Sequence, residues 1–307
     1  MKKYKKNRFK TGLVVGTQGI GQAHVREFTN FGINKIGLFG KKFDKNRIKK
    51  LKIEKTNLIK FFNLRNFSEI RKFKPKVVSI CSPTKLRSQH IQNFSKISKN
   101  LLIEKPLIWN NNFNNYNEAK KVFKLKNNLI VNLPMISLAS QISAKEQIKK
   151  INKINFDYYT NGKNTFKNIP VDLLPHALSF CITILKKNVI SYKIARVKQK
   201  KLSWNCIIYL NNCKCHFRLR QNKEKKTSKL TFKLNNNRYF RKQIKIKNIY
   251  KNLIIKNKKQ IIKVKNPMTE YILKSLKNFN NKEYLSHNNK FVLLITKISQ
   301  ELINYKK

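Results

Sequence analysis

The sequence predicts a two-domain α/β protein: a doubly wound parallel sheet, followed by an α/β domain with a large, mostly antiparallel open sheet. Strand-like and helix-like segments alternate over residues 9–134, which is typical of parallel sheets. Alternating polar and apolar residues with Asn-rich turns dominate 189–264, which is typical of antiparallel sheets. A length of 307 residues suits two domains of ordinary size. We place them at 1–134 and 135–307.

The first domain is expected to contain six strands, because short apolar runs are bounded by Gly, Pro or Asn. These runs cover 11–15, 34–39, 57–62, 76–81, 100–104 and 128–133. Longer amphipathic segments between them predict helices at 24–31, 45–53, 67–73, 90–98 and 114–125.

The second domain is expected to begin with helices at 143–152 and 171–185. Strands should follow at 192–199, 204–212, 213–221, 229–236, 238–246, 252–257 and 260–265. Tyr158 and Tyr159 fall on a further predicted strand, where packing explains them better than contact with a substrate. Two helices, 267–279 and 289–303, close the chain, and Pro267 suits a helix start. Whether they pack back on the first domain stays open.

The charge is extreme: 70 Lys and Arg residues against 13 Asp and Glu give a formal net charge of +57. Lysine is spread along the whole chain, and only 11 of the basic residues are arginine. A dedicated nucleic-acid binder more often has clustered arginine and a bounded patch. We therefore expect a globally basic surface with weak, salt-sensitive attraction to polyanions and no specific nucleic-acid partner.

Composition also indicates the compartment. No apolar run approaches the length of a membrane helix, and the apolar segment near the N-terminus is too short for a signal peptide, so no membrane is expected. Five cysteines are too few and odd for a disulfide framework, which favours a reducing cytoplasm. The cluster Cys206, Cys213, Cys215 and His216 lacks the other half of a metal site, so we predict structural thiols and no metal.

The string VVGTQGIGQAH (14–24) follows a predicted strand and opens a helix, the context of a dinucleotide-binding loop. Gly16 and Gly21 fit the usual spacing, but Gln18 holds the central position and Gly19 follows it. A glycine-rich turn without a ligand is the alternative. The residues predicted to contact the dinucleotide here are Gly16, Thr17, Gln18, Gly19, Ile20 and Gly21.

The second strand ends at Gly40, Lys41 and Lys42, where an NAD-specific loop usually has a carboxylate for the ribose. Without that carboxylate a 2′-phosphate is not repelled, and two ammonium groups are available to pair with it. This favours NADP over NAD as the cofactor.

Two further strings carry chemistry. The fifth strand ends in Glu104, Lys105 and Pro106, at the edge where ligands of open parallel sheets collect. The predicted helix 171–185 places Asp172 and His176 four residues apart, on one face. A histidine to exchange a proton and a lysine to stabilise an alkoxide suit alcohol–carbonyl redox chemistry.

Together, GTxxxGxxH (16–24), EKP (104–106) and DxxxH (172–176) resemble the glucose–fructose oxidoreductase, inositol dehydrogenase and rhizopine-catabolism (Gfo/Idh/MocA) family. The resemblance implies a Rossmann domain, an open-sheet domain and oxidation of a hydroxyl, or its reverse, on a sugar-like or cyclitol-like molecule. It implies that Lys105 contacts the reacting oxygen and the cofactor ribose, that Asp172 positions substrate, and that His176 is the general acid/base. Ser82, Pro83 and Glu104 join the predicted cofactor-binding residues.

The sequence departs from the family at several positions. Gln18 replaces the central glycine, Arg87 stands where the family usually has a histidine, and Ser179 and Phe180 replace an acid. An imine or enone reductase on the same fold, or a non-catalytic cofactor-binding relative, therefore stays an alternative. The resemblance also implies a homodimer or homotetramer built through the second sheet.

Overall fold

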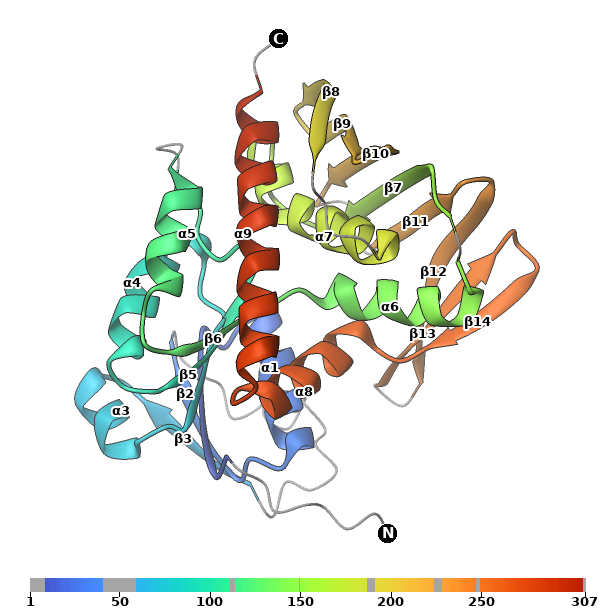
Figure 1. Ribbon diagram of the computed structural model, residues 1–307. Helices are drawn as coiled ribbons and strands as arrows, with labels where there is room; N and C mark the ends of the chain where they lie inside the picture. The colour runs from blue at the N-terminus through green and yellow to red at the C-terminus, as the bar shows by residue number, and fades with distance from the viewer. Residues whose placement is uncertain are drawn as a thin grey trace. The chain divides into compact units, whose positions relative to one another are not determined.

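The computed structural model describes residues 9–40, 59–110, 114–148, 150–186, 191–223, 228–246 and 249–305 (Figure 1). The chain forms two compact units. Unit 1 comprises Met1–Asn132 and Ile272–Leu293, and unit 2 comprises Leu133–Tyr271 and Leu294–Lys307. The helix predicted at 45–53, together with Lys41 and Lys42, lies outside the described residues.

Unit 1 contains sheet A, a six-stranded parallel sheet in the order β3-β2-β1-β4-β5-β6. Its strands are β1 (Thr11–Val15), β2 (Lys35–Phe39), β3 (Lys60–Leu64), β4 (Val77–Ile80), β5 (Asn100–Glu104) and β6 (Asn128–Asn132). The central strands are almost wholly buried, as expected of a sheet covered on both faces. The predicted doubly wound parallel sheet is confirmed.

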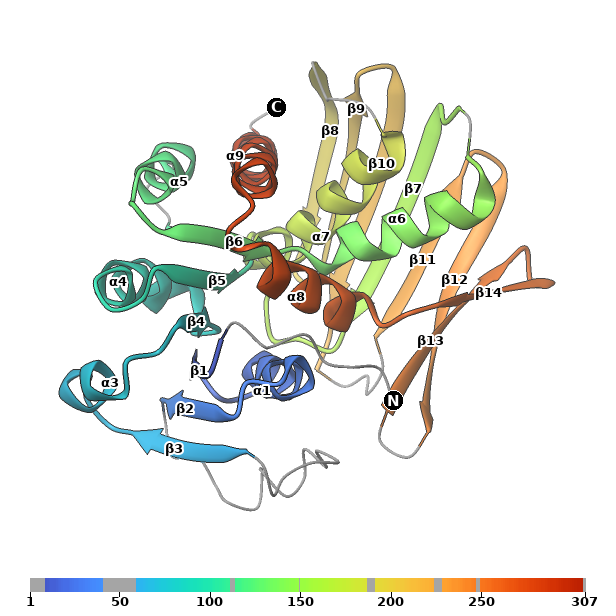
Figure 2. The same cartoon turned by 60° about the horizontal axis from the view of Figure 1, so that its bottom comes forward.

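Helices cover both faces of sheet A: α1 lies on one face, and α3, α4 and α5 lie on the other (Figure 2). They are α1 (Ile20–Phe31), α3 (Phe67–Phe73), α4 (Thr84–Ser95) and α5 (Asn115–Phe123). α1 and α4 begin earlier than their apolar periodicity suggested, directly after Gly19 and Pro83. Both residues end an irregular turn that follows a strand, and helix-compatible residues follow at once.

Unit 2 contains sheet B, with eight strands in the order β14-β13-β12-β11-β7-β10-β9-β8. They are β7 (Lys153–Thr160), β8 (Tyr192–Lys200), β9 (Ser203–Leu210), β10 (Cys213–Gln221), β11 (Lys229–Leu234), β12 (Asn237–Ile246), β13 (Ile249–Lys256) and β14 (Gln260–Val264). Every neighbouring pair is antiparallel except β7 with β10. The predicted mostly antiparallel sheet is confirmed.

Two helices, α6 (Pro134–Glu146) and α7 (Asn168–Leu185), lie along one face of sheet B (Figure 2). The helix predicted at 143–152 is wrong, because α6 begins at Pro134 and ends before Gln147, whose φ is 47°. The residues that follow lead into β7, so pairing within the sheet overrides their helix propensity. Two helices close the chain: α8 (Pro267–Asn278) and α9 (Lys282–Asn304).

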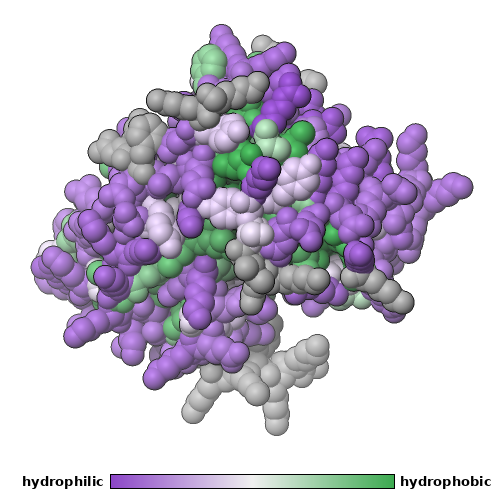
Figure 3. Space-filling model, turned by 45° about the horizontal axis from the view of Figure 1, so that its top comes forward, coloured by the Kyte–Doolittle hydropathy of each residue, from purple (hydrophilic) through white to green (hydrophobic). Residues whose placement is uncertain are grey.

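The helix α7 is long and apolar enough to cross a membrane by composition, with a mean hydropathy of 1.4. Within unit 2, however, 78% of it is buried, as in the core helix of a folded domain. Its apolar residues pack against β7, β9 and β10. Most of the surface drawn in Figure 3 is hydrophilic, as the high lysine content requires.

The open edge of sheet A is capped by a side chain. Asn288, on the part of α9 that belongs to unit 1, is buried beside the edge strand β6. Its Oδ1 accepts from the Val131 amide at 3.1 Å, and its Nδ2 donates to the Val131 carbonyl at 3.4 Å. One amide side chain thus pairs both backbone groups of Val131, as a residue of a neighbouring strand would.

We predict that Asn288→Ala lowers the free energy of unfolding by about 2 kcal/mol, because two buried backbone groups lose their partner. Urea unfolding measures the loss, and hydrogen exchange at the Val131 amide localises it. The exposed neighbour change Lys290→Ala serves as the control and should leave both unchanged. Equal stability of the Asn288 and Lys290 variants would contradict the capping role.

Candidate functional site

The glycine loop between β1 and α1 is folded tightly against the sheet. Gly16 has φ 83°, and a Cβ there would lie 2.9 Å from the Cys81 backbone. A Cβ at Gly21 would lie 1.9 Å from the Gly16 carbonyl oxygen. Larger residues are therefore excluded at both positions, and the first turn of α1 can approach β1 closely.

The loop is open at Gly19. This residue has φ 53°, and a Cβ added there would meet no atom within 4 Å. The exposed Gln18 precedes it. The backbone carbonyl oxygen of Gln18 accepts a hydrogen bond from the Gly21 amide at 3.0 Å. The glycine before the helix is thus Gly19, and the Gln18 side chain does not fill the loop. Backbone amides at the start of α1, beside a glycine without a side chain, fit a pyrophosphate.

The end of β2 meets this loop. Gly40 has φ 146°, and a Cβ added there would lie 3.6 Å from Gly16 Cα and 3.8 Å from the Thr17 amide nitrogen. The structure therefore brings together the predicted residues Gly16, Thr17 and Gly40 in unit 1. Lys41 and Lys42 lie outside the described residues, so their role stays a prediction.

The turn after β4 lies against the glycine loop, at the same edge of sheet A. Ser82 is buried, and among the described residues its Oγ has no hydrogen-bond partner. Arg87 is 4% exposed; it donates from Nη2 to the Ser82 carbonyl at 2.8 Å and from Nη1 to the Pro106 carbonyl. Arg87 therefore ties the turn after β4 to the segment after β5. The orphaned Ser82 hydroxyl and the glycine cradle both fit a dinucleotide.

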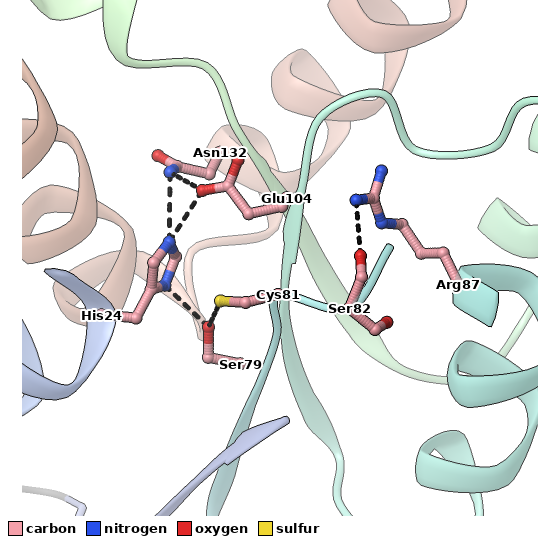
Figure 4. A network of polar contacts seen from close by, with 7 residues as sticks. All are labelled: His24, Ser79, Cys81, Ser82, Arg87, Glu104 and Asn132. Atoms are coloured by element: carbon pink, nitrogen blue, oxygen red, sulfur yellow. Dashed lines mark hydrogen bonds and ion pairs between the residues drawn. The ribbon is translucent and has the colours of Figure 1, made fainter. Parts of the chain in front are cut away.

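A buried polar network lies beneath this edge (Figure 4). His24 Nε2 lies 2.8 Å from Glu104 Oε1, and His24 Nδ1 lies 2.7 Å from Ser79 Oγ. Asn132 Nδ2 donates to the same Glu104 oxygen. Since Ser79, Glu104 and Asn132 sit on β4, β5 and β6, His24 of α1 links the ends of three strands.

The pair is ionic at neutral pH. Burial by itself lowers the pKa of His24, but Cys81 and Glu104 outweigh it and raise the pKa to about 10. Burial by itself raises the pKa of Glu104, but His24, Lys105 and Asn132 outweigh it and lower the pKa to about 2. One oxygen of the carboxylate, Oε1, is engaged inside unit 1 by His24 and Asn132, and its contact with a cofactor stays a prediction.

Lys105 follows Glu104 directly, and the Lys105–Pro106 peptide bond is cis. Because Glu104 is held by His24 and Asn132, and Pro106 by Arg87, the backbone is fixed on both sides of Lys105. The lysine thus leaves the carboxyl edge of sheet A from a rigid segment.

Unit 2 carries the other predicted pair on α7. Asp172 Oδ2 accepts from Gln221 Nε2 at 2.7 Å and from Asn164 Nδ2 at 3.5 Å. His176 is 9% exposed, and its ring packs in a T-shaped arrangement with the Tyr158 ring, with the ring centroids 5.7 Å apart. Both side chains are thus oriented by neighbours in unit 2, in the manner expected of a preorganised site.

Two of the positions that differ from the family, Ser179 and Phe180, face the core of unit 2. Ser179 and Phe180 are fully buried; Ser179 Oγ donates to the His176 carbonyl at 3.1 Å, and Phe180 packs on Phe156 and Phe232. An acid at either position would be buried among apolar groups. Ser179 and Phe180, which stand in place of that acid, therefore suit the buried packing of α7.

The sequence did not predict the residues that hydrogen-bond the carboxylates of Glu104 and Asp172. His24 was visible in GTxxxGxxH, but nothing in the sequence linked it to Glu104 across 80 residues. Asn132 and Gln221 end strands without any motif. Tertiary pairing alone gives these three residues their roles.

All five cysteines are free and buried. Cys213 Sγ lies 4.0 Å from Cys215 Sγ, and burial raises the pKa of Cys206. Within the described parts of the chain, no group of three or more potential ligands is arranged to hold a metal ion. The four thiols of unit 2 act as small apolar side chains between α7 and sheet B.

Comparison with known proteins supports this description. Residues 10–135 match the family model described as "Oxidoreductase family, NAD-binding Rossmann fold", named GFO_IDH_MocA, which confirms the resemblance predicted from the sequence and the nicotinamide-dinucleotide class of cofactor. No curated protein sequence matches the chain.

Solved structures share the fold over nearly the whole chain. UDP-N-acetylglucosamine 3-dehydrogenase GnnA from Acidithiobacillus ferrooxidans has 11% identity and a TM-score of 0.64, with 96% of each chain covered. The dehydrogenase MviM from Clostridium difficile has 14% identity and a TM-score of 0.66, covering 97% of this chain and 99% of that one. KijD10, a 3-ketoreductase from Actinomadura kijaniata solved with TDP-benzene and NADP, has 10% identity and a TM-score of 0.63, covering 94% and 95%.

The His24–Glu104 pair predicts a pH window of stability. The lowered pKa of Glu104 contributes stability above its usual value of 4.5, and this is lost as pH falls through about 2. The raised pKa of His24 contributes stability that is fully present below pH 6.5, its usual pKa. This stability is lost as pH rises through about 10. The pair should therefore stabilise most at about pH 4.5–6.5.

We expect Glu104→Gln to lower the unfolding free energy by about 3 kcal/mol in that window and by less on either side. Urea unfolding of both proteins from pH 3 to 9 measures the difference. Glu118→Gln, which removes an exposed partner of Lys121, is the matched control and should change stability by less than about 0.5 kcal/mol throughout. A difference that does not vary with pH would refute the ionic assignment.

Proposed function

We propose that this chain is an NAD(P)-dependent enzyme acting on a secondary alcohol, because residues 10–135 match the NAD-binding Rossmann model of the GFO_IDH_MocA oxidoreductase family. The substrate is a sugar-like or cyclitol-like molecule, and the reverse reaction reduces the corresponding ketone. The observation that carries the proposal is the oriented Asp172–His176 pair on one helix of unit 2. Two sugar-related structural neighbours, a UDP-N-acetylglucosamine 3-dehydrogenase and a 3-ketoreductase, support the substrate class.

Each unit contributes a part of the chemistry. In unit 1 the amides at Gly19 and the start of α1, with Ser82, would hold the dinucleotide, whose nicotinamide accepts or donates a hydride. The Lys105 ammonium would stabilise negative charge that develops on the substrate oxygen. Its rigid backbone serves this task, since electrostatic stabilisation requires a fixed donor.

In unit 2 the His176 imidazole would take the hydroxyl proton during oxidation and return it during reduction. Asp172 would accept hydrogen bonds from substrate hydroxyls. Gln221 and Asn164 bind one oxygen of this carboxylate, Oδ2, which orients the other toward a ligand. The low exposure of His176 limits competing proton exchange with bulk water.

We predict that His176→Ala lowers turnover by roughly 10²–10⁴-fold, because the proton then has no positioned acceptor. The assay incubates the protein with NADP⁺ and a panel of sugars, amino sugars, cyclitols and nucleotide sugars, and follows absorbance of the reduced cofactor. NADPH binding, measured by fluorescence, should not change in the variant. Full activity in His176→Ala would remove this residue from the mechanism, and activity on none of the panel would refute the proposed substrate class.

We also propose a preference for NADP, because Gly40 is followed by two lysines where an acid would select NAD. Lys42→Glu should then weaken NADPH binding at least tenfold relative to NADH, through repulsion of the 2′-phosphate. Fluorescence titration with both cofactors measures the ratio. Lys10→Glu, a charge change before β1, is the control for net charge. An equal change of the NADPH-to-NADH binding ratio in the two variants would contradict a specific contact of Lys42 with the 2′-phosphate.

A further inference from the structure

The face of sheet B that carries α7 also carries an arginine. Arg241 on β12 pairs with Leu230 on β11, which pairs with Tyr158 on β7. Residues paired in this way point to the same side of a sheet, and Leu230 and Tyr158 are both buried on the helix-covered side. The half-buried Arg241 therefore belongs to the face of His176, not to the opposite face.

Arg241 is linked to His176 through one aromatic side chain. Its guanidinium carbon lies 6.0 Å from the centroid of the Tyr158 ring. The same ring meets His176 edge-on at 5.7 Å. The Tyr158 ring thus contacts both the imidazole of His176 and the guanidinium of Arg241.

The charge of Arg241 is not balanced within the described parts of the chain. A few other cations of unit 2 do have carboxylates: Arg220 Nη2 lies 2.9 Å from Asp157, and Lys256 Nζ lies 2.5 Å from Glu146. No described carboxylate lies within ion-pair distance of Arg241. A half-buried guanidinium without an anion is a ready binding group for a phosphate or carboxylate.

The next row of the same face is polar. Thr160 on β7 pairs with Gln221, and Gln243 on β12 pairs with Asn252 on β13. Asn252 is 2% exposed, and neither its Nδ2 nor the buried Thr160 Oγ1 has a hydrogen-bond partner among the described residues. A purely structural row would satisfy such buried donors, so these atoms point to a ligand.

We propose that Arg241 forms an anion-binding subsite of unit 2, which pairs with a phosphate or carboxylate carried by the substrate. Tyr158 contacts both this arginine and His176, beside which the substrate carbon reacts. The inference rests on the proposed function and narrows it: the substrate is a sugar phosphate, a nucleotide-linked sugar or a sugar acid, not a neutral sugar.

Isothermal titration of the full chain at physiological salt tests the subsite without turnover. The probes are glucose 1-phosphate, UDP-N-acetylglucosamine, glucuronate and glucose. The wild type should bind at least one anionic probe ten or more times more tightly than glucose, and the preferred probe distinguishes phosphate from carboxylate. Arg241→Met, which keeps the stem and removes the charge, should weaken that probe about tenfold or more and leave glucose unchanged.

The control is Arg238→Met, which removes the same charge from an exposed position of β12 on the opposite face. Equal weakening by both variants would show attraction to the net charge and overturn the proposal, as would anionic probes that bind no better than glucose. Turnover is read separately. Arg241-dependent binding without turnover would refute the proposed oxidoreductase activity and support the anion subsite. Turnover of a neutral sugar that Arg241→Met leaves unchanged would support the oxidoreductase activity and refute the anion subsite.

Discussion

The buried ion pair between His24 and Glu104 is the interaction on which unit 1 depends. Parallel strands bring their carboxyl ends to one edge, but nothing in the backbone fixes how side chains meet there. His24 does so by contacting β4 through Ser79 and β5 through Glu104, while Asn132 on β6 binds the same carboxylate. Because the charges compensate each other inside the protein, the edge is rigid before any ligand arrives.

Both units use the same device, in which amide groups hold a carboxylate. In unit 1 Asn132 holds Glu104, and in unit 2 Gln221 and Asn164 hold Asp172. The outcome differs, because Glu104 is buried against an imidazole, whereas Asp172 is bound by two amide side chains and stays half-exposed. The first carboxylate serves the fold, and the second is left available for recognition.

The sequence was sufficient for most of the fold. β1, β5, α3 and β10 lie where apolar periodicity places them, since these segments pack in the way their pattern implies. The errors fall where local propensity and tertiary pairing disagree, as at 143–152, whose residues favour a helix but lead into β7. Motifs located Lys105, Asp172 and His176, yet the groups that orient them, such as Gln221, lie 49 residues away from Asp172 and have no local signature.

Helix α7 both carries the candidate site residues and forms the core of unit 2, and this links the loss of activity on heating to the unfolding of unit 2. The helix that presents Asp172 and His176 is also the core of unit 2, with eleven of its last thirteen residues, from Leu173 to Leu185, buried under sheet B. No local opening can release the pair while the sheet stays intact. Thermal inactivation and loss of the tertiary structure of unit 2 should therefore be one cooperative event, with no inactive intermediate that keeps its core.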